Sequence, residues 1–241
     1  TKSITMIVPF PPGGLADIVA RPVAEAMSRE LGQTVVVENR AGAGGALAGQ
    51  SVVKSTPNGS EIFFAASPTM TITPHVLKAM TFDPLKDLTP LAPILSYANV
   101  LVINLNQPFK TLPELVAYAK ANPGKIDYAS LGVGSQPHVA MEAWAQRLGI
   151  KLNHIPYKTN PSPDVMSGVV SLSIEASTTA IPLITSGKVK GLAISGAERI
   201  ASLPNVPTMT EFGANLDVNG VIGSSWHGIF VPTGTPDDIV A

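Results

Sequence analysis

The sequence predicts an α/β fold, because short apolar segments alternate with segments of helical periodicity along the whole chain. The strand-like segments, such as residues 4–8 and 100–104, are rich in Val, Ile and Leu, which is typical of strands buried on both faces. Turns containing Gly and Pro separate them from the helices, and the 241 residues include 21 Gly and 22 Pro. We therefore expect parallel sheets covered by helices on both faces.

The first half of the chain begins with a strand at residues 4–8 and a helix at residues 15–31. Apolar side chains recur at helical spacing within 15–31, and Gly32 supplies a C-terminal cap signal. A Gly-rich segment at residues 41–49 opens a second helix that runs to residue 53. Further strands are predicted at residues 34–37, 61–65, 91–95 and 100–104, and a further helix at 112–121.

The second half repeats the arrangement that opens the chain, with a strand, a Gly-containing turn and a long helix from residue 127 onward. Strands are predicted at 126–129, 152–155, 172–175, 189–194 and 226–231, and helices at 135–148, 161–167 and 180–186. The simplest explanation of the repeat is two α/β lobes. We place the first lobe at residues 1–103 and the second at 104–222, with a return to the first lobe at 223–241. The crossovers are expected at 104–109 and 220–225.

The two ends of the chain carry their own expectations. Thr235, Pro236 and two acidic residues form a strong helix start, yet only three residues follow, so we expect the natural protein to continue beyond Ala241. The first residues lead directly into a strand and show no signal-peptide pattern. If the protein is exported, its signal has been removed.

Composition excludes several classes of function. The formal net charge of −1, without a run of Lys or Arg, argues against nucleic-acid and acidic-membrane partners. The lack of Cys excludes a thiol nucleophile and Cys-ligated metals. The apolar runs are far shorter than the roughly 20 residues that a membrane span needs. No phosphate loop, metal-ligand spacing or nucleophile–base pair is present, so we expect no cofactor, no metal and no catalysis.

Two turns carry the candidate chemistry. Gly13, Gly14 and Leu15 open the first helix, and a second Gly-rich turn, which contains Gly134 and Ser135, opens the helix at 135–148. Backbone N–H groups at helix N-termini favour anions through hydrogen bonds and the helix dipole. The candidate residues of these turns are Gly13, Gly14, Leu15, Asp17, Ser130, Gly134, Ser135, Gln136 and His138.

Plainer interpretations stand beside this one. Gly-rich turns before helices are ordinary joints in α/β folds. Asp17 precedes Arg21 by four residues, the favourable order for a helix-surface ion pair. His138 lies in a first helical turn, where packing or capping explains it equally well. The Gly-rich segment at 42–45 lacks a dinucleotide fingerprint, because Leu47 stands where the third Gly is needed.

Motifs along the whole chain resemble the Bug-type solute receptors, the substrate-binding proteins of tripartite tricarboxylate transporters. The motifs that carry the resemblance are Pro9–Gly14 with Asp17 and Ala20-Arg21, Glu38–Gly45, Pro57–Gly59, Thr81–Pro84, His154–Lys158, Gly187–Ala193, Pro204–Thr208 and Gly234–Pro236. They occur in the family's order and cover essentially all of the chain.

The resemblance implies a two-lobed periplasmic binding-protein fold, type II-like, with the ligand in a cleft between the lobes. It implies that backbone amides of the two turns hold a carboxylate, with variable contacts from Ser67, Thr69, Ser177 and Thr178 and apolar walls from Phe10 and Tyr157. The hydroxyl residues after position 176 favour a ligand without an amino group, whereas Glu175 leaves an amino acid open.

The sequence therefore indicates a monomeric periplasmic receptor for a di- or tricarboxylate or an aromatic acid. Hinge closure around the ligand would present it to the membrane subunits of a tripartite transporter. The alternative is a ligand-sensing domain of the same fold that acts in signalling through protein–protein contact. A signal peptide encoded in the gene favours the receptor, and a DNA-binding domain at that place favours the sensor.

Overall fold

The computed structural model describes residues 3–78, 80–212 and 225–240. The chain divides into unit 1, Thr1–Ser96 with Trp226–Ala241, and unit 2, Tyr97–Ser225. The division falls before strand β5 (Asn99–Ile103), whereas the sequence interpretation ended the first lobe after residue 103. The second predicted crossover lies, up to residue 224, outside the described residues.

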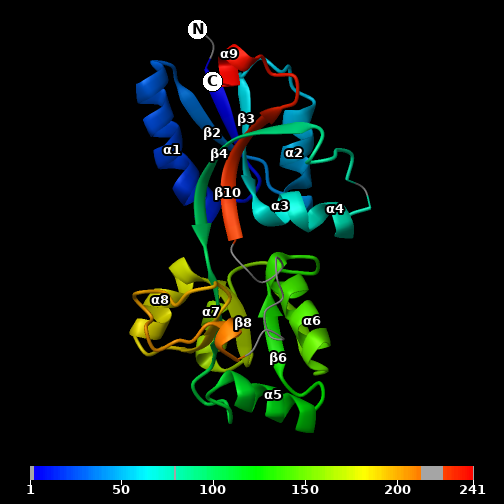
Figure 1. Ribbon diagram of the computed structural model, residues 1–241, viewed down its shortest axis with the longest axis vertical. Helices are drawn as coiled ribbons and strands as arrows, with labels where there is room; N and C mark the ends of the chain where they lie inside the picture. The colour runs from blue at the N-terminus through cyan, green and yellow to red at the C-terminus, as the bar shows by residue number, and fades with distance from the viewer. Residues whose placement is uncertain (1–2, 79, 213–224, 241) are drawn as a thin grey trace. The chain divides into compact units, whose positions relative to one another are not determined.

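Unit 1 contains a five-stranded sheet in the order β2-β1-β3-β10-β4 (Figure 1). Its strands are β1 (Ile4–Val8), β2 (Val35–Asn39), β3 (Glu61–Ala66), β4 (Leu88–Tyr97) and β10 (Ser225–Pro232). Strand β1 pairs in parallel with β2 and β3, and β10 pairs antiparallel with β3. The carboxyl ends of β1, β2 and β3 therefore lie at one edge of this sheet.

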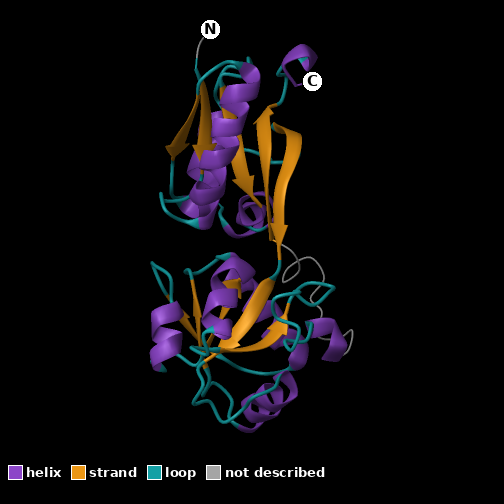
Figure 2. Cartoon of the chain, turned by 90° about the vertical axis from the view of Figure 1, so that its left-hand side faces the viewer, coloured by secondary structure: helices purple, strands orange, loops and turns teal. Residues whose placement is uncertain are grey.

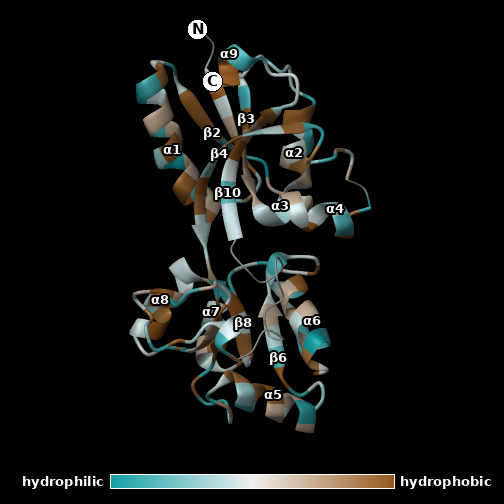
Figure 3. Cartoon of the chain, in the orientation of Figure 1, coloured by the Kyte–Doolittle hydropathy of each residue, from teal (hydrophilic) through white to brown (hydrophobic). Residues whose placement is uncertain are grey.

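Helices cover both faces of the unit 1 sheet. Helix α1 (Leu15–Leu31) packs Ala16, Ala20 and Ala24 on Met6, Val8 and their neighbours, while α2 (Ala46–Val53) packs on the opposite face beside Ile7 and Phe63. In Figure 1 the two helices lie on opposite sides of the strands. Hydrophilic and hydrophobic residues alternate along α1, as Figure 3 shows. The helix ends at the predicted Gly32 cap, whose φ is 60°.

Unit 2 contains a second five-stranded sheet in the order β7-β6-β8-β5-β9. Its strands are β5, β6 (Asp127–Ser130), β7 (Asn153–Pro156), β8 (Leu172–Ala176) and β9 (Lys190–Ile194). Strand β6 is parallel to β7 and β8, whereas β5 is antiparallel to β8 and β9. The expectation of parallel sheets was therefore wrong, and both sheets are mixed.

The reason lies in how the two exceptional strands enter their sheets. Parallel neighbours are joined by crossover connections, usually helical. Strand β5 instead follows β4 almost directly, with Ala98 between them. No α-helix of the described residues lies between β9 and β10. Neither β5 nor β10 is oriented by a helical crossover. Strand β5 runs antiparallel to β8 and β9, and β10 runs antiparallel to β3.

Helices also cover both faces of the unit 2 sheet (Figure 2). On one face α5 (Leu112–Ala121) and α6 (Gln136–Leu148) enclose a core with Tyr128 and Trp144, and on the other α7 (Ser162–Ser167) and α8 (Ser177–Thr185) enclose Val100 and Val102. The remaining helices are η1 (Ala43–Gly45), α3 (Ser67–Thr71), α4 (Thr73–Val76), η2 (Met209–Phe212) and α9 (Asp237–Val240). Among the described residues, no helix has the length and apolarity needed to cross a membrane.

Candidate functional site

The turn between β1 and α1 is held by a carboxylate from the first turn of the helix. The Gly13 N–H donates to Asp17 Oδ2 at 2.9 Å, and Arg21 donates from Nε and Nη2 to the two Asp17 oxygens at 3.0 and 2.8 Å. The predicted Asp17–Arg21 pair is thus present, and it also fixes the turn. Arg21 and the Gly13 amide lower the pKa of Asp17 to about 2, so its carboxylate stays charged near neutral pH.

Gly14 occupies the N-cap position of α1 in an extended conformation, with φ −80° and ψ 170°. Its carbonyl accepts from Ile18, and no side chain of the described residues caps the helix. Gly13 and Gly14 are both exposed, and Leu15 is half-buried. The start of α1 therefore presents accessible backbone at a helix N-terminus, where an anion is favoured.

The hydroxyl residues after β3 are engaged within unit 1. Thr69 is fully buried and donates to the Gly44 carbonyl at 3.0 Å, and Ser67 Oγ accepts the backbone N–H of Trp226 at 3.3 Å. Both residues belong to α3, a helix that the sequence analysis did not predict. Phe10 packs against the α1 core. Thr69 thus ties the loop after β2 to the loop after β3.

The turn between β6 and α6 is organised by two serine hydroxyls. Ser130 Oγ accepts the Gly132 N–H at 3.1 Å, and Ser135 Oγ donates to the Gly132 carbonyl at 2.6 Å. Ser135 occupies the N-cap position of α6, and Gln136 is the first residue of the helix. Gly134 has a φ of 80°, in the left-handed region that favours glycine. The turn is therefore shaped by its own side chains.

A stack of rings lies beside the second turn. The Gly134 N–H donates to His138 Nδ1 at 3.1 Å, and the His138 ring stacks on His154 with centroids 4.2 Å apart. His154 Nε2 lies 2.6 Å from Ser130 Oγ, and its ring stacks on Tyr128 at 4.9 Å. Burial is the main cause that lowers the pKa of His154, and the neighbouring His138 lowers it further. His154 was not among the predicted site residues, because a single His on a strand carries no spacing signal.

The other unit 2 candidates lie at the carboxyl ends of β7 and β8. Tyr157 donates to Asp164 Oδ2 at 2.7 Å, and this bond raises the pKa of Tyr157 to about 12. Ser177 and Thr178 open α8, three residues earlier than predicted, with Ser177 buried and Thr178 exposed. Glu175 is buried and accepts from Ser173 Oγ at 2.7 Å, while burial raises the pKa of its carboxyl.

The structure thus brings the candidates together within each unit, at the carboxyl ends of its parallel strands. Unit 1 groups those after β1 and β3, which are Phe10, Gly13, Gly14, Leu15, Asp17, Ser67 and Thr69. Unit 2 groups those after β6, β7 and β8, which are Ser130, Gly134, Ser135, Gln136, His138, Tyr157, Ser177 and Thr178.

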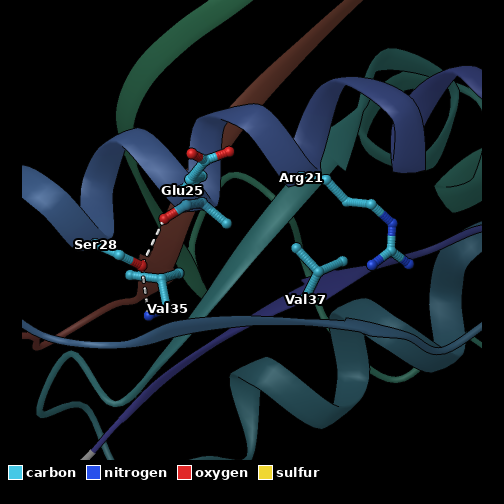
Figure 4. Close-up of a pocket in the computed structure, with 6 residues that line it drawn as sticks. Arg21, Glu25, Ser28, Val35 and Val37 are labelled. Atoms are coloured by element: carbon cyan, nitrogen blue, oxygen red, sulfur yellow. Dashed lines mark hydrogen bonds between the residues drawn. The ribbon is translucent and has the colours of Figure 1, made fainter.

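Two surface cavities are lined by residues other than these candidates. One, of about 300 Å³, lies between α1 and β2 and is lined by Arg21, Glu25 and Ser28 of the helix and by Val35 and Val37 of the strand (Figure 4). The Ser28 hydroxyl there joins the two elements, because it donates to the Ala24 carbonyl and accepts the Val35 N–H. The other, of about 320 Å³, is an apolar groove between β4 and β10. Within the described part of the chain, no group of three His, Asp or Glu side chains could hold a metal.

The two sheets and their helices define the class of protein, because solved periplasmic binding proteins have the same fold. BugD, a periplasmic binding protein, is 34% identical with a TM-score of 0.82, over 99% of this chain and 79% of BugD. Rhodopseudomonas palustris Rpa4515, solved with adipate, is 31% identical with a TM-score of 0.85, over 100% of this chain and 80% of Rpa4515. MatC from the same organism, solved with bound malate, is 30% identical with a TM-score of 0.85, over 100% and 81% of the two chains.

The family follows from the sequence. Residues 19–241 match the tripartite tricarboxylate transporter family receptor, TctC. BugT of Bordetella pertussis is 36% identical over 242 residues, which cover 99% of this chain and 73% of BugT. The chain belongs to the TctC family of solute-binding receptors, and the Bug-type resemblance and the α/β two-lobed fold class predicted from the sequence are confirmed.

Proposed function

We propose that this receptor binds a small organic carboxylate in the periplasm and delivers it to the membrane subunits of a tripartite tricarboxylate transporter. It acts as a monomer and catalyses no reaction. The observation that carries the proposal is the pair of glycine turns at the starts of α1 and α6. It is supported by the likeness of the chain to two proteins that were solved with adipate and with malate. No observation favours the signalling alternative.

The proposed contacts are mainly backbone amides. In unit 1 we assign the amides of Gly14 and Leu15, because the Gly13 N–H is already bonded to Asp17. Gly13, Asp17 and Thr69 then act by shaping the turn and its neighbouring loop, with Phe10 and Ser67 at its border. Hydrogen bonds from N–H groups to an ionised carboxylate are stronger than neutral ones, so no Arg or Lys is required.

In unit 2 we assign the amide of Gln136 at the start of α6. The Gly134 N–H is bonded to His138 Nδ1 and the Ser135 N–H to the Gly132 carbonyl, so in this state these two residues shape the turn. Thr178 is exposed at the start of α8 and is suited to a direct contact, whereas Ser177 is buried. Ser130, His138 and Tyr157 complete the proposed set. The Glu175 carboxyl accepts from Ser173 and is buried, so we do not assign it as a partner for a ligand ammonium group. This supports a ligand without an amino group.

The test is a thermal-shift screen of the full-length protein against mono-, di- and tricarboxylates, aromatic acids and acidic amino acids. A ligand at about 100 times its Kd stabilises the fold by about 2.7 kcal/mol, which raises Tm by several degrees at this size. A selective shift by carboxylates is the expected result. A well-folded protein that no carboxylate shifts would overturn the proposal.

A matched pair of variants at Gly14 tests the proposed contact. The φ of −80° suits any residue, a built Cβ lies 3.6 Å from its nearest atom, and both Asp and Asn are good N-caps. Gly14→Asp and Gly14→Asn should therefore fold equally well. Only Gly14→Asp places a negative charge at the proposed carboxylate position, and we expect it to lose binding. Equal affinities in the two variants would contradict the assignment.

A further inference from the structure

Both turns use the same local device, although the acceptor differs. In each, the N–H of a glycine donates to a side chain four residues later, in the first turn of the following helix. Gly13 donates to the Asp17 carboxylate at 2.9 Å, and Gly134 donates to His138 Nδ1 at 3.1 Å. An N–H that is bonded within the protein is unavailable to a ligand. Whether the Gly13 or Gly134 N–H can bind a ligand therefore depends on the side chain that accepts it, Asp17 or His138.

The hydrogen bond to Gly134 defines the state of the His138 ring. An imidazole nitrogen that accepts a hydrogen bond carries no proton, so His138 is neutral here, with its proton on Nε2. Protonation would make Nδ1 a donor, break this bond and leave the Gly134 N–H pointing away from its former partner. Histidine is the side chain that changes charge near neutral pH, whereas the pKa of Asp17, about 2, keeps that acceptor charged.

Titratable groups of β6, β7 and α6 lie in the ring stack that contains His138 or beside it. His154 on β7 stacks on it, and burial, with His138 beside it, lowers the pKa of His154. Tyr128 on β6 donates to Glu142 Oε1 on α6, and this carboxylate is the negatively charged neighbour of the stack. Ser130 is bonded to His154 and Gly132. Within this stack, His138 is the ring whose Nδ1 accepts the Gly134 N–H.

We propose that the binding of an anion to the unit 2 turn is coupled to the uptake of one proton by His138, which releases the Gly134 N–H to the ligand. The ligand gains one backbone donor and a neighbouring imidazolium. Neither is available while His138 is neutral. The unit 1 turn takes up no proton in the same way, because the Asp17 carboxylate that accepts the Gly13 N–H stays charged. The inference rests on the proposed function and adds the pH regulation of the same site.

Calorimetry on the full-length protein tests the coupling, with adipate and malate as probes between pH 6 and 8, where simple carboxylic acids are ionised. Titrations in buffers of different ionisation enthalpy measure the protons taken up per ligand bound. We expect uptake approaching one proton, and a Kd that falls by up to tenfold for each unit of acidification. Binding with no dependence on the buffer would overturn the coupling and leave the receptor function intact.

Two variants assign the proton. His138→Gln can still accept from the Gly134 N–H but does not titrate, so we expect weaker binding without proton uptake. His75→Gln is the matched control, because His75 is an exposed His of unit 1, on α4, and it should keep the wild-type uptake. Uptake that persists in His138→Gln would overturn the assignment to His138. If no carboxylate binds the wild-type protein, the receptor function itself fails.

Discussion

Asp17→Asn is the substitution that most directly tests how the unit 1 turn is held. The wild-type carboxylate is buried and accepts from the Gly13 amide and from two nitrogens of Arg21. The Asn side chain has the same shape, but it removes the charge and places an amide donor against the guanidinium. The fold should survive with a lower free energy of unfolding, and the loss should be confined to unit 1.

The magnitude follows from the pKa of Asp17, which is lowered from 3.8 to about 2. One pKa unit corresponds to about 1.4 kcal/mol, and solvent around the partly exposed Arg21 weakens the pair, so we expect a loss of about 2 kcal/mol at pH 7. Because the folded pKa lies below the unfolded one, this stabilisation is complete above 3.8 and disappears as the pH falls through 2. The wild-type protein should therefore lose about 1 kcal/mol between pH 5 and pH 3 from this group.

Urea unfolding followed by tryptophan fluorescence measures the effect in the right unit. The chain has two Trp, and Trp144 belongs to unit 2 whereas Trp226 belongs to unit 1. A Trp144→Phe background leaves Trp226 as the reporter of unit 1. The matched control is Glu25→Gln, which removes an ion pair of the same spacing with Arg29 on the same helix, but between exposed side chains. Such pairs contribute about 0.3–0.5 kcal/mol.

The reasoning would be refuted if Asp17→Asn and Glu25→Gln changed the unfolding free energy of unit 1 by equal amounts at pH 7. It would also be refuted if the difference between the two variants persisted unchanged at pH 3. Either result would mean that the buried carboxylate adds nothing beyond a surface ion pair.

Three further predictions concern the stability of unit 1. Gly13→Ala should cost about 1–2 kcal/mol, because its φ of 81° lies in the left-handed region. Gly14→Ala should cost about 0.5–1 kcal/mol, because its φ of −80° suits any residue but Ala is a poorer N-cap than Gly, and urea midpoints compare the two variants. Gly45→Ala should cost more than about 2 kcal/mol, because its Cβ would lie 2.3 Å from Thr69 Oγ1 at a φ of 91°, and Thr69→Ala should restore only part of this loss. Burial lowers the pKa of His227 from 6.5 to about 4, so the free energy of unfolding should fall by about 2 kcal/mol between pH 7 and pH 5. Urea unfolding at these two pH values measures the loss, which a His227→Gln variant should lack.

Local signals in the sequence predicted the elements that local interactions determine. Helix α1 begins and ends at the predicted residues, because glycine at both ends and apolar spacing between them define it. The direction of β5 and β10 could not be predicted in this way, since strand pairing depends on residues distant in the sequence. Helices α3 and α4 were missed because each is about one turn long and contains Pro.

The site was predictable to a similar extent. Glycine before a helix start identified both turns, and the spacing of Asp17 and Arg21 identified their pair. The sequence did not show that Asp17 holds the Gly13 amide, because that bond depends on the backbone geometry of the turn. His154 was missed for a different reason. Its contacts with Ser130 and His138 join neighbouring strands and a helix, and none of them is local in sequence.

The difference between the two turns has a consequence that can be tested by exchanging their acceptors. A carboxylate at position 138 would hold the Gly134 N–H at every physiological pH, as Asp17 holds the Gly13 N–H. It would also place a permanent negative charge where the proposed ligand binds. We therefore expect His138→Asp to weaken adipate and malate binding more than His138→Gln does, with no proton uptake in either variant. Calorimetry at pH 6 separates the two, and equal or tighter binding by His138→Asp would show that the Gly134 amide is not a ligand donor.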